Sequence, residues 1–566
     1  MKHLFLYLTT AVSLIFTVPY GWASNLSKND IQTYKQIFDA HQKGQYSQAK
    51  KLQTKLSDKS LKGYILHDKY FSPRYKTSAQ EVNSFLKTYK HLPIATDVYA
   101  LGKKKGFKIS TQPPKDKVYG SSASTCSYVR RDEPINLISR QKFSYLNSDQ
   151  KKQAKAISKR LKSLIEQKKL KLAIALLEER KTQKLFNQKD TDIVYTAIAF
   201  SYFLDDNDEA ALKYAKKAIN GSGDTLPLAH WTAGLSSWRS KEYKDAAHFF
   251  AQAATHDEGY PLLKGSAGFW AARAYLKLGE FKKVGDFLEL AAQQPRTFYG
   301  LLALYMLGDN LENILDEESH PQTGKKATFS HPALNRFYNL KKVGKNTLAD
   351  KELAALYLSL SKEKKEALIS LAHQRGFYKE LTSLAGVSED TKERFPLPNW
   401  KPLNNWKVKK ELVFSFVRQE SCFNKHARSA VGARGLMQIM PQTGRVIAKM
   451  NNMTFNLAKM ENESYNLTLG QNYLLYLMEL PAINYNLIFT AVAYNAGPGN
   501  LIKWKKQMNY QNDPLLFIES IPSKETRGFV ERIMVNYWIY SSLTKSDMGS
   551  LESIIHGKWP IYKPKN

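Results

Sequence analysis

One glutamate lies on the apolar face of a helix, where acids are rarely found. Four residues of the segment 411–423 recur at the spacing of one helix face: Val413, Phe416, Val417 and Glu420. Burial disfavours a charged carboxylate, and the negative end of the helix dipole acts in the same direction, so the pKa of Glu420 is expected above its ordinary value of about 4.3. A carboxylic acid that stays protonated near neutral pH can protonate a glycosidic oxygen.

Glu420 has no second acid close to it in the sequence. Between Ser421 and Met460 there is no Asp or Glu, whereas six Lys or Arg residues occur there. Most glycosidases use two carboxylates, one as acid and one as nucleophile or base. A single acid fits a reaction in which the substrate supplies the nucleophile. The spacing alone leaves open a structural glutamate at a helix end, paired with Arg418 or another base.

The elements before this segment read as a helical repeat. From about residue 28 to 308 helices follow one another, and two segments are related by a shift of 38 residues. The matching positions are Trp231, Ala233, Tyr243 and Ala253–Ala254 in the first segment and Phe269, Ala271, Phe281 and Ala291–Ala292 in the second. Helix pairs of this period predict a solenoid similar to tetratricopeptide arrays, with these aromatic and alanine positions in its core.

Two breaks divide the chain. Residues 103–134 contain Pro113, Pro114, Gly120 and a serine cluster and predict a long irregular stretch. Residues 390–406 contain three prolines and mark the entry to a C-terminal domain. Between the solenoid and this entry, residues 330–388 predict short helices whose closely spaced leucines are buried on more than one side.

The N-terminus and the charge indicate where the chain works. Residues 1–23 have a charged start, an apolar stretch and small residues before a cut after Ala23, which predicts a cleavable signal peptide and a periplasmic location. No later segment is long enough to span a bilayer, so integral membrane association is not expected. The formal charge of +33 predicts attraction to an anionic polymer, and export excludes nucleic acid. The distant cysteines Cys126 and Cys422 are expected to be free thiols.

Short motifs in the C-terminal part resemble the soluble lytic transglycosylases. They are Glu420-Ser421, the stretch GARGLMQIMP at 432–441, AYNAGP at 493–498, Ile521-Pro522 and Glu525-Thr526-Arg527. The order of the motifs is that of the family, and Thr297-Phe298-Tyr299-Gly300 in the solenoid is similar to it as well. Three positions depart from the family's pattern: Lys425 where proline is usual, Phe529 where tyrosine is common, and Cys422 where a smaller residue is usual.

The resemblance implies an all-α protein made of an N-terminal α-superhelix and a C-terminal lysozyme-like domain. The implied domains are a U-shaped superhelix at 24–310, a helical linker at 311–395 and the catalytic domain at 396–566. The implied reaction cleaves the β-1,4 bond between N-acetylmuramic acid and N-acetylglucosamine in peptidoglycan without water. The muramyl 6-hydroxyl attacks its own C1 and leaves a 1,6-anhydro end, with Glu420 acting first as acid and then as base.

Other site residues follow from the match with the motifs. Tyr494 is implied to place its hydroxyl close to the reacting centre. Ser429, Gln438 and Met440 match positions that line the sugar groove. Asn495 belongs to a turn for which a structural role stays open beside a contact with the substrate. Glu525 matches a second glutamate of the groove, and an ion pair between Glu525 and Arg527 is the alternative for it.

Two other functions stay open on the same fold. A muramidase-type hydrolase would need a carboxylate to activate water, and Glu525 is the candidate. A non-catalytic scaffold would only bind peptidoglycan. Peptidoglycan glycan strands are the expected partner in all three cases, and other cell-wall enzymes are further candidates. Neither a cofactor nor a metal is expected, because the histidines are dispersed and the acids lack ligand spacing.

Overall fold

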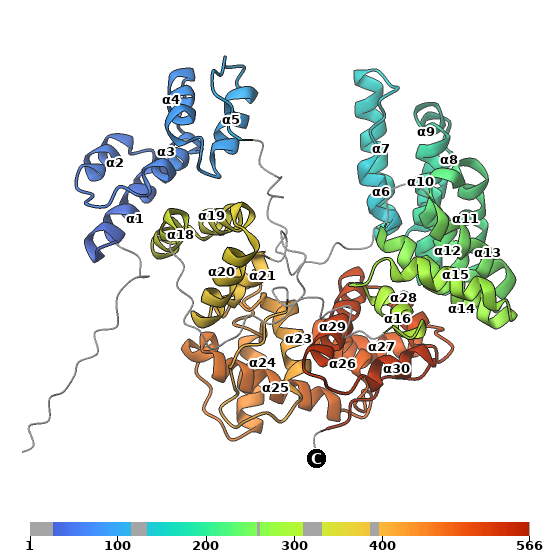
Figure 1. Cartoon of the computed structure of the whole chain (residues 1–566). Coiled ribbons are helices and arrows are strands. Elements are labelled where there is room, and N and C mark those ends of the chain that lie inside the picture. Colours follow the sequence, from blue (N-terminus) through green and yellow to red (C-terminus); the bar gives the residue numbers. More distant parts are fainter. Residues whose placement is uncertain (1–25, 115–132, 257–260, 310–330, 385–394, 565–566) are drawn as a thin grey trace, which may run out of the picture. The chain divides into compact units, whose positions relative to one another are not determined.

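The computed structural model describes residues 26–114, 133–256, 261–309, 331–384 and 395–564, and its regular elements are helices (Figure 1). In these ranges extended pairing is confined to isolated β-bridges. The prediction of an all-α fold is therefore confirmed. Packing divides the described chain into two units, one built from residues 26–114 and 331–384 and the other from residues 133–309 and 395–564.

The first unit contains two groups of helices that are distant in sequence. They are α1 (Lys28–Gln42), α2 (Tyr46–Gln53), α3 (Lys62–Tyr70), α4 (Ala79–Tyr89) and α5 (Ala95–Lys104), then α18 (Pro332–Lys342), α19 (Asn346–Ser359), α20 (Lys362–Gln374) and α21 (Tyr378–Leu384). A buried contact joins the groups, because the Tyr64 hydroxyl donates to Glu352, which also accepts a hydrogen bond from Arg336 at 2.5 Å. The helices predicted within residues 330–388 are thus present.

The second unit begins with a run of antiparallel helix pairs. They are α6 (Pro134–Arg140), α7 (Ser148–Glu166), α8 (Leu170–Glu178), α9 (Arg180–Leu185), α10 (Gln188–Leu204), α11 (Asp208–Ser222), α12 (Pro227–Arg239), α13 (Tyr243–Thr255), α14 (Pro261–Leu278), α15 (Phe281–Ala292) and α16 (Phe298–Met306). We call residues 133–309 the repeat region. The pairs α12–α13 and α14–α15 coincide with the two related sequence segments, so the predicted repeat is confirmed.

Large aromatic side chains fill the space between these pairs. Trp231 lies 5.4 Å from Phe250 and 6.4 Å from Trp270 between ring centroids, and Phe250 lies 5.5 Å from Trp270. Gly234 on α12 makes this packing possible, because a Cβ atom at that position would lie 2.6 Å from the ring of Phe250. The close approach of α12 and α13 therefore depends on a glycine.

The prediction that Phe281 lies in the core of the repeat is wrong. Phe281 is 71% exposed, although its counterpart Tyr243 packs on Trp238 with ring centroids 5.2 Å apart. The residue 38 positions after Trp238 is Leu276, which is itself 47% exposed. The sequence of the second pair lacks the large ring against which the first aromatic packs, so Phe281 remains in solvent.

The rest of the second unit is the C-terminal helical group. Its helices are α23 (Lys410–Ser421), α24 (Pro441–Met450), α25 (Glu463–Glu479), α26 (Leu487–Ala496), α27 (Pro498–Gln507), α28 (Pro514–Ser520), α29 (Lys524–Leu543) and α30 (Gly549–Ile555). Residues 395–409 precede α23 without a helix, as predicted for the break at 390–406. The long helix α29 packs against both α23 and α26 and forms the centre of this group.

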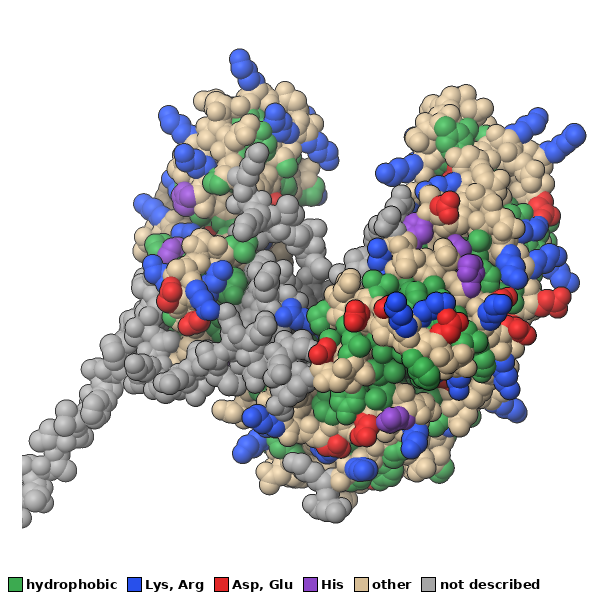
Figure 2. Space-filling model, turned by 45° about the vertical axis from the view of Figure 1, so that its right-hand side comes forward, with side chains coloured by type: hydrophobic (Ala, Val, Ile, Leu, Met, Phe, Trp, Pro, Cys, Tyr) green, Lys and Arg blue, Asp and Glu red, His purple; other side chains and the backbone are tan. Residues whose placement is uncertain are grey.

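Several sequence predictions fall wholly or partly outside the described residues. The signal peptide at 1–23 is one of them, and most of the irregular stretch at 103–134 is another; of that stretch, residues 105–114 are described and are not helical. The domain boundaries at 24–310, 311–395 and 396–566 stay predictions. Within the described ranges, no helix combines the length and apolar character needed to span a membrane. On the face shown in Figure 2, Lys and Arg side chains are spread over the surface rather than gathered in one patch.

Candidate active site

Glu420 occupies the last turn of α23, and the predicted apolar face of this helix is confirmed. Val413, Phe416 and Val417 are buried, and Glu420 on the same face is partly buried. The helix ends at once after it, because Cys422 adopts a left-handed backbone conformation with φ of 51°. Arg418 is engaged elsewhere: its Nη1 donates to Asn536 Oδ1 at 3.0 Å, and its guanidinium lies 4.1 Å from the ring centroid of Phe395.

The environment of Glu420 raises its pKa to about 8. Burial is the main cause, and the negative charge of Glu525 on α29 adds to it, while Arg532 on the same helix acts in the opposite direction. Arg532 also donates from Nε to Gln419 Oε1 at 2.7 Å, which holds it beside the end of α23. At neutral pH the carboxyl group of Glu420 is therefore mostly protonated and can act as a general acid.

Tyr494 from α26 lies beside this acid. Its hydroxyl donates a hydrogen bond of 2.6 Å to the carbonyl oxygen of Met437, and its ring packs on Phe416 with centroids 4.6 Å apart. The pKa of Tyr494 is raised well above 10, first because of burial and then because of the charge of Glu420. The phenol consequently keeps its proton and connects α26 to the loop after α23.

The loop 424–440 carries three predicted site residues. Ser429 closes its turn, because its Oγ accepts a hydrogen bond of 3.0 Å from the backbone N–H of Ala433. Gln438 donates from Nε2 to the carbonyl oxygens of Ala427 at 3.0 Å and Gly435 at 2.9 Å. Met440 is 39% exposed at the end of the loop. Gln438 and Ser429 therefore maintain the shape of the loop, and Met440 offers an apolar surface.

Asn495 and Glu525 lie at neighbouring positions on α26 and α29. Asn495 Oδ1 accepts a hydrogen bond of 2.7 Å from the hydroxyl of Thr526, the residue after Glu525. Glu525 itself is exposed. The alternative ion pair between Glu525 and Arg527 is not formed, because Arg527 pairs with Glu133 and donates to the carbonyl oxygen of Ile521. The structure thus brings Glu420, Tyr494 and Glu525 together, with Asn495 fixing the start of α29.

Two residues of the site were not found from the sequence. Arg532 could have been found, since it follows Glu525 by seven positions and so shares its helix face. No sequence pattern points to Glu133, because its partner Arg527 on α29 lies nearly four hundred positions further along the chain.

The prediction of a free thiol is wrong for Cys422, which is disulfide-bonded. Separation in the sequence gave no support for a bond, but the fold brings distant segments together. Cys126 lies outside the described residues. Among the residues that the structure describes, no group of three or more His, Cys, Asp or Glu side chains is arranged to hold a metal ion.

The fold and the site together define a helical-repeat protein whose C-terminal helical domain contains a partly buried, protonated glutamate. The family model for the transglycosylase SLT domain matches residues 399–517, a range that includes Glu420, the loop 424–440 and Tyr494. The domain belongs to this family, and the resemblance seen in the sequence is confirmed. Glu525 lies beyond the matched range.

A curated relative and two solved structures agree with this assignment. The soluble lytic murein transglycosylase of Escherichia coli K12 is 30% identical over 275 residues, which are 47% of this chain and 42% of that protein. The chain therefore spans about two fifths of the length of this relative. The crystal structure of the 70 kDa soluble lytic transglycosylase of Escherichia coli matches with a TM-score of 0.58 at 19% identity, over 91% of this chain and 97% of that chain.

The lytic transglycosylase of Pseudomonas aeruginosa, solved as an inactive mutant, matches with a TM-score of 0.59 at 18% identity, over 93% of this chain and 99% of that chain. At such identities the likeness shows the fold. It confirms a helical superhelix combined with a lysozyme-like domain.

Proposed function

We propose that this chain is a lytic transglycosylase that cleaves the β-1,4 bond between N-acetylmuramic acid and N-acetylglucosamine in peptidoglycan. The observation that carries the proposal is a carboxylic acid with a pKa of about 8 at the end of α23, inside a transglycosylase SLT domain. The Pseudomonas aeruginosa neighbour adds support, because its inactive mutant replaces a glutamate by glutamine.

Glu420 performs both proton transfers in this proposal. Its carboxyl proton moves to the glycosidic oxygen, the bond between that oxygen and C1 of the muramyl residue breaks, and N-acetylglucosamine leaves with a new hydroxyl group. The resulting carboxylate then accepts the proton of the muramyl 6-hydroxyl, whose oxygen forms the new bond to C1. The product is a 1,6-anhydro ring, and no water is consumed. The acetamido group of the substrate stabilises the positive charge that develops at C1.

The neighbouring residues hold the substrate and the acid in place. Tyr494, fixed by Met437, places a neutral hydroxyl beside Glu420. Ser429, Gln438 and Met440 shape the loop along which the sugars bind, with Gln438 contributing an amide group that suits an acetamido group and Met440 an adaptable apolar contact. Asn495 near the end of α26 and Glu525 in the first turn of α29 also contact the substrate.

A muramidase-type hydrolase is the second candidate, and one observation keeps it in view. The charge of Glu525 acts on Glu420, so a carboxylate able to activate water lies close to the acid. A scaffold that only binds peptidoglycan is less well supported, because holding a partly buried acid in its protonated form costs stability that binding alone does not require.

The proposed location is the periplasm, reached through the signal peptide at 1–23. The formal charge of +33 suits peptidoglycan, whose peptide stems and lactyl groups carry carboxylates. Other cell-wall enzymes are proposed as partners on the same grounds of location.

Mass spectrometry of the soluble products from purified sacculi tests the proposal, with the Glu420→Gln variant as control. We expect muramyl ends that lack one water from the wild type and no products from the variant. Reducing, hydrated ends would identify a hydrolase and direct attention to Glu525. If neither protein released products although both bound sacculi, the scaffold would replace both enzymes.

A further inference from the structure

The residues that place Glu525 opposite Glu420 are held by the repeat region. We call residues 513–527 the anchored segment; it comprises α28, the turn at 521–523 and the first turn of α29 with Glu525. Three of its charged residues are fixed by side chains of the repeat region, which belongs to the same packed unit. These residues are Asp513, Glu519 and Arg527.

Asp513 connects the start of α28 to two helices of the repeat region. Its Oδ1 accepts hydrogen bonds from the backbone N–H groups of Leu515 at 2.9 Å and Leu516 at 3.3 Å and so caps α28. Its Oδ2 accepts from Arg273 Nη2 on α14 at 2.8 Å and from Trp238 Nε1 on α12 at 3.3 Å. The Arg273 guanidinium stacks on the ring of Trp238, 4.5 Å from its centroid, which restricts the arginine.

Glu519 fixes the other end of α28. This carboxylate is fully buried and accepts a hydrogen bond of 2.6 Å from the hydroxyl of Tyr299 at the start of α16. Tyr299 is itself 2% exposed. Because a buried carboxylate that loses a donor pays a large desolvation penalty, this contact strongly disfavours any displacement of α28 from α16.

Arg527 provides the anchor closest to Glu525. Its side chain is buried, pairs with Glu133 directly before α6, and also donates to the carbonyl oxygen of Ile521. The Phe200 ring on α10 lies 5.4 Å from its guanidinium. The ion pair therefore holds the first turn of α29 against the repeat region two residues after Glu525.

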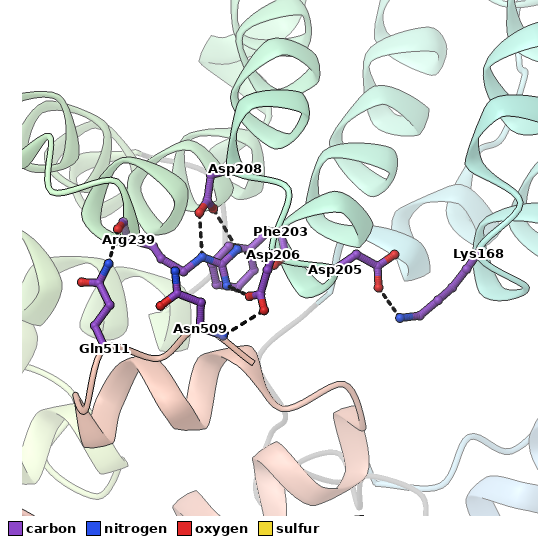
Figure 3. A network of polar contacts seen from close by, with 8 residues as sticks. All are labelled: Lys168, Phe203, Asp205, Asp206, Asp208, Arg239, Asn509 and Gln511. Carbon is purple, nitrogen blue, oxygen red and sulfur yellow. Dashed lines mark hydrogen bonds and ion pairs between the residues drawn. The ribbon is translucent and has the colours of Figure 1, made fainter. Parts of the chain in front are cut away.

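The loop that enters the anchored segment is held as well (Figure 3). Asp206 accepts a hydrogen bond of 2.8 Å from the backbone N–H of Asn509 and pairs with Arg239 at 2.5 Å. Gln511 donates to the carbonyl oxygen of Arg239. Arg239 has almost no exposed surface and also binds Asp208 at 2.8 Å. The repeat region thus contacts this stretch of chain at intervals from residue 509 to residue 527.

We propose that the repeat region completes the active site by positioning Glu525, and that Glu133, Asp513 and Tyr299 are positioning residues for the reaction of Glu420. The kinetic test of this inference rests on the proposed function, because it needs turnover of glycan strands. The charged or titratable groups around Glu420 are Glu525 and Arg532 on α29 and Tyr494 on α26, with Tyr473 of α25 behind Tyr494. Release of the anchored segment moves Glu525 away from Glu420, which weakens their repulsion.

The decisive variant is Tyr299→Phe, because it removes one hydroxyl and changes no charge. We expect the alkaline limb of kcat/KM on glycan strands to move to lower pH by roughly half a unit, which is about a threefold loss above the limb. Glu133→Gln is expected to shift the limb in the same direction, and Glu133→Asp to restore most of it. The matched control is Glu179→Gln, the same change at another residue that directly precedes a repeat-region helix, where it is exposed.

An equal loss of activity at all pH values, with the limb unmoved, would make these residues merely structural and overturn the proposal. If the limb moved in Glu133→Gln but not in Tyr299→Phe, the shift would come from the lost charge of Glu133 and not from positioning, and the proposal would be overturned as well. Infrared difference titration of the full-length chain against Glu420→Gln reports the carboxyl of Glu420 without turnover. Through that measurement the proposal can succeed or fail even if the wild type forms no anhydro product.

Discussion

The charge of Glu525 is, after burial, the strongest influence that raises the pKa of Glu420. Glu525 stands in the first turn of α29 and Glu420 in the last turn of α23, and these two helices pack against each other. Two like charges at such a place favour the protonated form of the more buried group. The charge of Glu525 therefore contributes to keeping Glu420 protonated, as the proposed role of Glu420 as general acid requires.

The first prediction concerns the pH dependence of the reaction. In the proposed reaction Glu420 is protonated at the start, so activity is expected to fall as the pH rises through about 8. Glu525→Gln removes the repulsion and is expected to move this limb of kcat/KM to lower pH by about one unit, within the range that a nearby charge produces. The exposed Glu552 on α30 provides the control Glu552→Gln, which should leave the limb in place.

The products of the Glu525→Gln variant separate the two enzymatic functions. A transglycosylase still forms anhydro ends in this variant, since Glu420 performs both proton transfers. A hydrolase that depends on Glu525 to activate water would stop releasing reducing ends.

The second prediction concerns stability. Between about pH 4.3, the ordinary pKa of a glutamate, and about pH 8, the folded chain keeps a proton on Glu420 that the unfolded chain has lost. The wild type therefore loses stability as the pH rises through this window, whereas Glu420→Gln does not. The variant is expected to gain about 1–3 kcal/mol over the wild type at pH 8 and almost nothing at pH 4.5, less than the full shift because solvent screens a partly exposed carboxyl.

Thermal unfolding of both proteins across this pH range measures the difference. A difference in midpoint that stays constant from pH 4.5 to 8 would show that Glu420 does not titrate there, and the role of the general acid would then need another residue.

The third prediction addresses Tyr494. Tyr494→Phe removes the hydrogen bond to the Met437 carbonyl and is expected to lower stability by about 0.5–1.5 kcal/mol. Activity is expected to fall roughly tenfold or more, because the loop 424–440 loses a fixed point and the reacting centre loses a hydroxyl. Steady-state kinetics together with thermal unfolding test both parts. Full activity in the variant would assign Tyr494 to the core alone.

The fourth prediction uses two glycines of the repeat region. Gly234→Ala places a Cβ atom 2.6 Å from the ring of Phe250 and is expected to destabilise the chain by about 1–3 kcal/mol. Gly285→Ala on α15 meets no atom within 4 Å and is expected to gain about 0.5–1 kcal/mol from helix propensity. Denaturant unfolding of the two variants measures the contrast, and equal effects would refute the packing between α12 and α13.

The fifth prediction concerns the charge of the chain. If the basic surface attracts the carboxylates of peptidoglycan, activity on sacculi should fall several-fold between about 0.1 and 1 M salt, as the Debye length shortens from about 10 Å to about 3 Å. Glycan strands without their peptide stems, which carry fewer carboxylates, are the control substrate and should respond less to salt. Activity that is insensitive to salt on both substrates would remove electrostatic attraction from the mechanism.

Local periodicity was sufficient to predict the helix that carries Glu420 and two helix pairs of the repeat region. The spacing of Val413, Phe416, Val417 and Glu420 indicated a helix face, and the shift of 38 residues predicted the pairs α12–α13 and α14–α15. Such patterns depend on contacts within one helix or between neighbours, which a single sequence records. Phe281 marks the boundary of this reasoning, because its exposure depends on whether a partner ring is present at position 276.

Contacts between distant segments could not be predicted in this way. Glu133 and Arg527 are separated by 394 positions, and Trp238 and Asp513 by 275. No periodic pattern links such residues, and their charges looked like those of any solvated helix face. The disulfide at Cys422 was missed for the same reason, since a separation in sequence says little about distance in a fold.

The cross-link at Cys422 has a consequence for when the enzyme becomes competent. Cys422 ends α23 two residues after Glu420, in the left-handed conformation that stops the helix. Reducing compartments keep cysteines as free thiols, so the disulfide bond at Cys422 forms in an oxidising environment. If the chain is exported as proposed, the end of α23 gains its covalent restraint only after it leaves the cytoplasm, and the surroundings of Glu420 are completed there.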